Sequence, residues 1–280
     1  MPTVRSGNTD IFYESSGRGE PLVLIHGSWG DHFEWQALIP CLTETFRVVA
    51  YDRRGHSQSE SGRRPGSRRE DEDDLAALMS TLDCAPGHLV GNSFGGSIAL
   101  GLAARRPDLI RTVMVHEPPL FAAAANDAEC RSLIEESSGV IREVLEKLSR
   151  GDDEEGFRQF VDEIALGPGA FQHIPDEMRR QYIRNAPTFM DEQRDPDWAN
   201  IDMDALADIS VPVLLTKGDQ SPRLLQAVLE ALSRRLNRAE VVSVPGAGHL
   251  PHVSHPEAYA ALMRSFISRA SVARESANPR

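Results

Sequence analysis

The stretch Gly91-Asn92-Ser93-Phe94-Gly95-Gly96 is the segment that says most about the fold of this chain. It follows a short apolar run, 88–90, and precedes a helix-like run, 97–104. Glycines two residues before and two residues after Ser93 remove side chains at a point where a strand and a helix nearly collide. The pattern therefore predicts a tight strand-to-helix turn that holds the serine in a strained conformation with its hydroxyl exposed.

Short apolar runs of the kind that form buried parallel strands recur along the rest of the chain. They lie at 21–25, 46–51, 88–90, 112–115, 211–216 and 241–244. Apolar residues at helical spacing alternate with them, at 75–82, 225–236 and 259–267. This alternation predicts an α/β fold with a mostly parallel sheet covered by helices on both faces, entered by an antiparallel hairpin around 4–14.

The alternation stops between about Pro118 and Asp208. This acidic stretch has helical patterns at 130–148, 157–164 and 176–184, with breaks near Gly151 and at 167–169. The sequence therefore predicts a helical insertion between two strands of the sheet.

Composition limits the class of partner. The chain has 280 residues and a net charge of −12, which argues against nucleic acid and anionic membrane as partners. Three widely spaced cysteines, the lack of an apolar run of ~20 residues and a polar start to the chain favour a cytoplasmic protein. We expect a small-molecule substrate. The sequence leaves the oligomeric state open, a homodimer included.

A serine hydroxyl is a weak nucleophile and needs a base, for which His249 is the best placed histidine. It lies in the glycine-rich segment 244–249, directly after the last apolar strand, and parallel sheets build their sites at the carboxyl ends of strands. His252 and His255 suggest a metal cluster, but Pro251 and Pro256 break any helix that would align them. We therefore predict no metal.

The histidine needs a carboxylate to hold its tautomer, and two candidates follow predicted strands. Asp219 follows the strand 211–216, and the order Ser93, Asp219, His249 is that of one hydrolase class. Glu117 follows the strand 112–115 and is the rival acid. We favour Asp219 and keep Glu117 open.

Two backbone N–H groups should stabilise a developing oxyanion. One is expected from Phe94, directly after the serine, and the other from the loop 26–30 after the first buried strand. Ser28 is our choice in that loop, with Trp29 as the alternative. We assign His26 a structural role in bracing neighbouring loops.

Three charged segments have simpler explanations than catalysis. We expect the charges of the turn 52–57 to pair with one another. The acidic run 70–74 should open a helix, where negative charge suits the helix dipole, with a solvated face favoured over a metal or partner site. The basic segment 63–69 is expected to be an exposed loop.

With these motifs in place, the chain resembles the α/β-hydrolase fold superfamily. The similarity rests on the segments 24–29, 51–57, 91–96 and 246–249. The resemblance implies an eight-stranded, mostly parallel sheet, no cofactor, and a helical cap after the sixth strand. The cap would span 121–204 and the core 1–120 and 205–280. Related epoxide hydrolases and haloalkane dehalogenases have aspartate as nucleophile, so Ser93 disfavours those activities.

The expected function is that of a serine hydrolase, with Ser93, His249 and Asp219 as catalytic triad and the Ser28 and Phe94 amides as oxyanion hole. It would cleave an ester or related acyl bond of a small apolar substrate through an acyl-enzyme. Carbon–carbon bond hydrolase, lactonase, perhydrolase and acyltransferase activities on the same triad are alternatives. A small-molecule receptor with this fold is a further alternative of a different class.

Overall fold

The computed structural model describes residues 1–62, 66–236 and 238–277. In this described part, eight strands form one sheet in the order β1-β2-β4-β3-β5-β6-β7-β8. β1 pairs with β2 and β2 with β4 in antiparallel fashion, and the other neighbours are parallel. The predicted α/β class, the mostly parallel sheet and the entry hairpin are confirmed.

The strands coincide with the apolar runs of the sequence because both faces of the sheet are covered. They are β1 (Thr3–Ser6), β2 (Thr9–Gly17), β3 (Glu20–Ile25), β4 (Phe46–Tyr51), β5 (Gly87–Asn92), β6 (Ile110–His116), β7 (Val213–Gly218) and β8 (Ala239–Val244). The central strand β5 is buried at every position.

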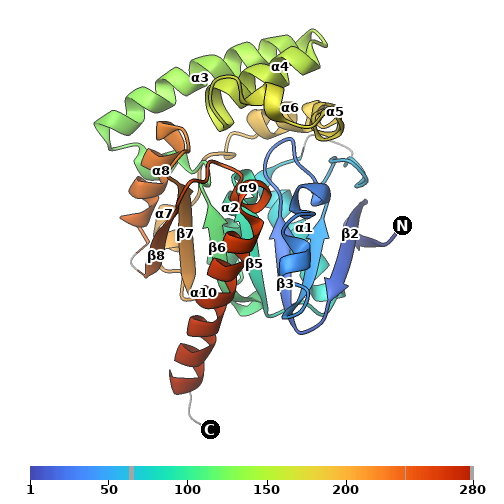
Figure 1. The fold of residues 1–280 in the computed structure, drawn as a ribbon, viewed down its shortest axis with the longest axis vertical. Helices are drawn as coiled ribbons and strands as arrows, with labels where there is room; N and C mark the ends of the chain where they lie inside the picture. The colour runs from blue at the N-terminus through green and yellow to red at the C-terminus, as the bar shows by residue number, and fades with distance from the viewer. Residues whose placement is uncertain (63–65, 237, 278–280) are drawn as a thin grey trace.

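Helices pack on both faces of this sheet. One core lies between the sheet and α1 (Arg68–Thr81), α2 (Phe94–Arg105), α7 (Met203–Ala207) and α8 (Arg223–Ser233). The other lies under the short helices η1 (His32–Trp35) and η2 (Ile39–Cys41) and the long α10 (Pro256–Ala277), which runs across the front of the sheet in Figure 1. The short α9 (Pro251–Ser254) precedes α10.

Between β6 and β7 the chain forms a separate layer of helices. It contains η4 (Phe121–Ala124), α3 (Ala128–Ser149), α4 (Asp153–Phe160), the π-helix η5 (Val161–Ala165), η6 (Ala170–His173), α5 (Asp176–Arg184) and α6 (Ala186–Arg194). Figure 1 shows α3 to α6 across one end of the sheet. This layer has its own apolar core, into which Trp29 projects from the loop after β3. The predicted helical insertion is thus present, and the division at 121–204 into a cap domain stays a prediction.

The acidic run differs from the solvated face expected of it. It does open α1, but Asp71, Glu72 and Asp74 are buried. Each is paired with arginines; Asp74, for example, lies 2.8 Å from Arg54. The helix turns these carboxylates inward because buried guanidinium groups need partners. Of the basic segment 63–69, residues 63–65 lie outside the described residues, while Arg68 and Arg69 already belong to α1.

Across the described ranges, the structure contains no helix long and apolar enough to cross a membrane.

Candidate active site

The turn after β5 has the strained geometry that its glycines predict. Ser93 has φ 51° and ψ −123°, a region that residues with a side chain rarely adopt. A Cβ at Gly91 would collide with the backbone of Gly95, and one at Gly95 would collide with the carbonyl oxygen of Ile25. The strand and the helix therefore approach as closely as only glycine allows, and Ser93 remains partly exposed above them.

His249 lies beside this serine. The two residues line the same two cavities, and the carbonyl oxygen of His249 accepts a 2.9 Å hydrogen bond from the side-chain amide of Asn92. The His249 side chain is only 6% exposed. The hydrogen bond from Asn92 thus holds the backbone of His249, the predicted base, close to Ser93, the predicted nucleophile.

The carboxylate that contacts His249 is Glu117, not Asp219. Glu117 Oε2 lies 2.7 Å from His249 Nδ1, and its other oxygen accepts a 2.9 Å hydrogen bond from the amide of Gly218. Asp219 is exposed, and its Oδ1 accepts a 2.8 Å hydrogen bond from the amide of Gly246. The contact with His249 that we expected of Asp219 is therefore made by Glu117, the rival acid, and the identity of the catalytic acid stays a proposal.

The reason lies at the carboxyl ends of β6 and β7. Glu117, with φ 46°, turns its side chain across the end of β7 and uses the amide of Gly218. A Cβ at Gly218 would collide with the carbonyl oxygen of Ala247, so the 247–249 loop packs directly on the end of β7. The space that an acid after β7 would need is thus filled, and Asp219 is directed outward.

Glu117 is ionised at neutral pH. Burial by itself raises the pKa of this carboxyl, but the hydrogen bond with His249, with smaller contributions from His116 and Ser221, lowers it to about 2. The neighbouring His116 has a pKa lowered to about 3, mainly by burial, and is therefore neutral at pH 7. Its Nε2 donates to the carbonyl oxygen of Gly248 at 3.2 Å and lies 3.5 Å from Glu117 Oε2.

The loop predicted to supply an oxyanion donor lies against the serine. A Cβ at Gly27 would come within 3.1 Å of the Cβ of Ser93. Ser28 lines both cavities beside Ser93, and its hydroxyl donates a 2.6 Å hydrogen bond to Glu192 of α6. Trp29, the alternative, has φ 66° and its ring is buried among aromatic residues of the helical layer. Phe94 is the first residue of α2.

The structural role assigned to His26 is confirmed. Its Nδ1 donates to the carbonyl oxygen of Gly27 at 2.8 Å, and its Nε2 accepts from the amide of Arg53 at 2.9 Å. The imidazole joins the oxyanion loop to the turn after β4. Burial lowers the pKa of His26 well below its ordinary value, so the ring is neutral.

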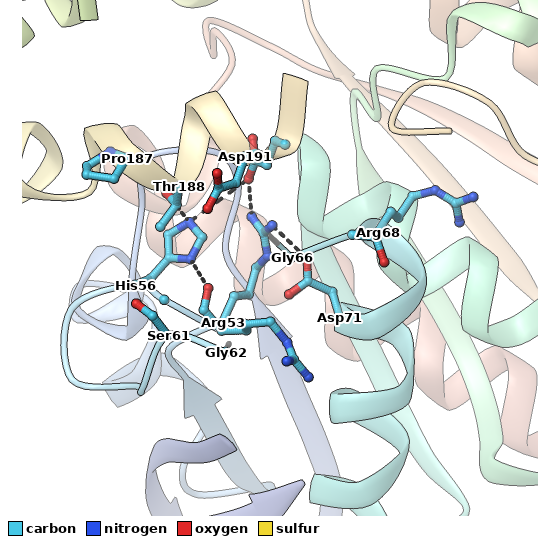
Figure 2. Close-up of a pocket in the computed structure, with 14 residues that line it drawn as sticks. Arg53, His56, Ser61, Gly62, Gly66, Arg68, Asp71, Pro187, Thr188 and Asp191 are labelled. Carbon is cyan, nitrogen blue, oxygen red and sulfur yellow. Dashed lines mark hydrogen bonds and ion pairs between the residues drawn. The ribbon is translucent and has the colours of Figure 1, made fainter. Parts of the chain in front are cut away.

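The charges of the turn 52–57 do not pair with one another as expected. Arg53 is buried between Asp71 of α1 at 2.9 Å and Glu192 of α6 at 2.8 Å. His56 Nε2 contacts the hydroxyl of Thr188 at 2.9 Å. Figure 2 shows this arrangement around a cavity of about 210 Å³, which Ser93 does not line. The turn therefore attaches the helical layer to the core, and its partners come from segments distant in sequence.

Two cavities flank Ser93. The first, about 50 Å³, extends toward Glu34, Phe157 and Tyr182. The second, about 40 Å³, extends toward Phe121, Trp198 and Leu224. The sequence analysis did not single out Glu34, a buried glutamate that lies between Phe33 and the buried Trp35.

Among the residues that the structure describes, two groups of side chains could offer metal ligands, His116–Glu117–His249 and Asp31–His32–Asp52. Their ligand atoms already have partners within the protein. His249 Nδ1 is bonded to Glu117, and His32 Nδ1 lies 2.6 Å from Asp52. The donor sets are therefore explained by hydrogen bonding without a metal.

Comparison with known proteins agrees with this fold. The profile of the alpha/beta hydrolase family matches residues 22–262. The chain belongs to this family, and it is accordingly an enzyme of the hydrolase class.

Its relatives have several activities. A pimeloyl-[acyl-carrier protein] methyl ester esterase of Neisseria meningitidis is 30% identical over 252 residues, 87% of this chain and 91% of that protein. A putative non-heme chloroperoxidase of Synechocystis is 28% identical over 94% of this chain and 96% of that protein. The biotin biosynthesis bifunctional protein BioHC of Teredinibacter turnerae is 29% identical over 88% of this chain, which spans 44% of its length. The family is thus established, and the particular reaction is not.

The fold is also found in solved structures. Carboxylesterase CesB of Bacillus subtilis superimposes with a TM-score of 0.76 at 19% identity, over 95% of this chain and 90% of that one. At this identity the likeness shows the fold alone.

Proposed function

We propose that this enzyme is a serine hydrolase that cleaves an ester or related acyl bond of a small substrate. Ser93 would attack the carbonyl carbon, and His249 would take the hydroxyl proton and return it to the leaving group. Glu117 would orient His249 and stabilise its charged form. The amides of Ser28 and Phe94 would stabilise the oxyanion.

One observation supports this proposal above the others. The buried imidazole of His249 has an ionised carboxylate 2.7 Å from its Nδ1, and shares two cavities with a serine held at positive φ. A carboxylate at Nδ1 fixes the tautomer in which Nε2 can accept a proton. This is the arrangement needed to activate an alcohol.

The two cavities beside Ser93 suit the two halves of an ester. One would hold the acyl group and the other the alcohol, with Phe160 and Ala165 lining both. A third cavity of about 330 Å³ also contains Tyr182 and His249 and lies beside α9 and η6.

The test is a comparison of wild type with Ser93→Ala on short p-nitrophenyl esters, together with labelling by a fluorophosphonate. We expect the variant to lose both ester turnover and labelling while its thermal unfolding is retained. Full activity in Ser93→Ala would show that another group is the nucleophile.

The same site suits carbon–carbon bond hydrolysis, lactone opening, perhydrolysis and acyl transfer. A panel of vinylogous diketones, lactones and acyl donors with hydrogen peroxide or competing alcohols would distinguish these from ester hydrolysis. Labelling of Ser93 without turnover of any panel member would favour a receptor.

A further inference from the structure

Three residues that line the first cavity beside Ser93 carry buried polar atoms that the triad does not explain. Within the described ranges, Glu34 Oε1, the hydroxyl of Tyr182 and the indole nitrogen of Trp29 are buried without a hydrogen-bond partner. All three residues line this cavity with Ser93 and His249. Glu34 is 4% exposed, Tyr182 7% and Trp29 1%.

Leaving such atoms unpaired is costly. A buried polar group without a partner costs about 1–3 kcal/mol, so three of them on residues that line one cavity call for an explanation. The obvious internal partner of Glu34 is His252, but the two side chains approach only to 3.5 Å and both ring nitrogens of His252 also lack a hydrogen bond. A ligand in the cavity would supply the hydrogen-bond partners that the protein does not.

The protonation of Glu34 determines which ligand fits. Burial, with a smaller contribution from the charge of Asp31, raises the pKa of this carboxyl to about 8. At neutral pH the carboxyl is therefore mostly protonated and can donate a hydrogen bond. The other ionisable groups that act on it are Arg53, Tyr182, His249 and His252. The pKa of His252 is lowered to about 3 by burial, so it brings no charge.

We propose that Glu34, Tyr182 and Trp29 form a polar subsite that binds a carbonyl oxygen of the substrate other than the scissile one. The carboxyl O–H, the phenol O–H and the indole N–H are all donors, and a carbonyl oxygen can accept from two of them at once. The substrate class is then an ester that carries a second, uncharged carbonyl group, rather than a wholly apolar ester. This inference rests on the proposed function, since it places the subsite beside the acyl or alcohol half of a bond attacked by Ser93.

The test uses pairs of esters in which a ketone C=O group of one ester is replaced by a CH(CH3) group of similar size in the other. Ethyl 3-oxobutanoate is compared with ethyl 3-methylbutanoate, and ethyl 4-oxopentanoate with ethyl 4-methylpentanoate, by titration of released acid. We expect wild type to prefer the oxo ester of at least one pair by tenfold or more in kcat/KM, which corresponds to about 1.4 kcal/mol. Ethyl 4-aminobutanoate tests whether the subsite instead binds a cation.

Variants of the subsite should remove the preference and retain turnover. Tyr182→Phe, which removes one oxygen atom, and Glu34→Leu should each bring the two esters of a pair within about threefold. Glu34→Gln keeps a neutral donor and should retain most of the preference. Ile174→Val changes an apolar residue of the same cavity and is the matched control, which should leave the ratio unchanged.

The outcomes separate the subsite from the triad. An equal rate on both esters of each pair in wild type, a preference that survives Tyr182→Phe, or a preference for the amino ester would each overturn the subsite while Ser93-dependent hydrolysis continues. Hydrolysis that survives Ser93→Ala would instead overturn the proposed function. If Glu34→Leu fails to fold, the subsite is tested by Tyr182→Phe and by the ratio of kcat/KM for the two esters of a pair in wild type.

Discussion

Replacing Glu117 by glutamine should prevent His249 from acting as a base without leaving a cavity in the site. The pKa of Glu117 is about 2 rather than the ordinary 4.5, so the site favours its ionised form by ~3 kcal/mol. Glutamine is neutral and nearly the same size, and its amide oxygen can still accept from Gly218. Its N–H₂ group, however, would donate to His249 Nδ1 and force the wrong tautomer. We expect kcat/KM to fall by roughly 10²–10⁴-fold.

The loss should appear in kcat rather than in KM, because Glu117 lines neither cavity beside Ser93. The assay is steady-state hydrolysis of p-nitrophenyl butyrate, with thermal unfolding as a check on the fold. Asp219→Asn is the matched control and should stay within about threefold of wild type, because its side chain is exposed and contacts the backbone of Gly246. A large loss in Asp219→Asn with little change in Glu117→Gln would refute the assignment of the acid.

Three further predictions concern stability. Gly95→Ala should destabilise the protein by more than ~2 kcal/mol in thermal or urea unfolding, because a Cβ there collides with the backbone after β3, whereas Gly139→Ala in open space on α3 should be neutral or stabilising. No loss in Gly95→Ala would contradict the close approach of α2 to the sheet. Glu192→Ala should cost about 3–5 kcal/mol, because it leaves the buried Arg53 with one of its two carboxylates and frees the Ser28 hydroxyl; a cost below ~1 kcal/mol would show that the pair is solvated. Glu34→Gln should change the pH dependence of stability. Since the folded pKa of Glu34, about 8, exceeds its unfolded value, the folded state retains a proton that the unfolded chain loses, and wild type loses stability as pH rises from ~4.5 to ~8. The difference in unfolding free energy between Glu34→Gln and wild type should therefore grow with pH through this window, by up to ~3 kcal/mol at pH 7, and a constant difference would show that Glu34 is ionised in the folded state.

The local patterns of the sequence predicted most of the fold because they depend on neighbours along the chain. Apolar runs mark the central strands, since a parallel sheet covered on both faces buries nearly every residue of a strand there. The glycines around Ser93 mark the strand-to-helix turn, since only they allow its close approach. α6 was not predicted, because its short sequence 186–194 begins with Ala-Pro and has few apolar residues in register.

Pairings between distant segments could not be read in the same way. The carboxylates of 70–74 look like a solvated run, and only their burial against arginines from other elements shows otherwise. The burial of Glu34 could not be predicted from the sequence either, because an isolated glutamate near aromatic residues is common on protein surfaces as well. Only the structure shows that its Oε1 is buried without a hydrogen-bond partner.

The sequence by itself determined the sheet, the serine turn and the histidine loop, together with two carboxylates at the ends of adjacent strands. Only the tertiary structure decided between Glu117 and Asp219. Both follow parallel strands that end at the same edge of the sheet, so their spacing along the chain cannot separate them. The choice depends on the backbone direction at Glu117, with φ 46°, and on the packing of the 247–249 loop over Gly218, which directs one carboxylate to His249 and the other to the surface.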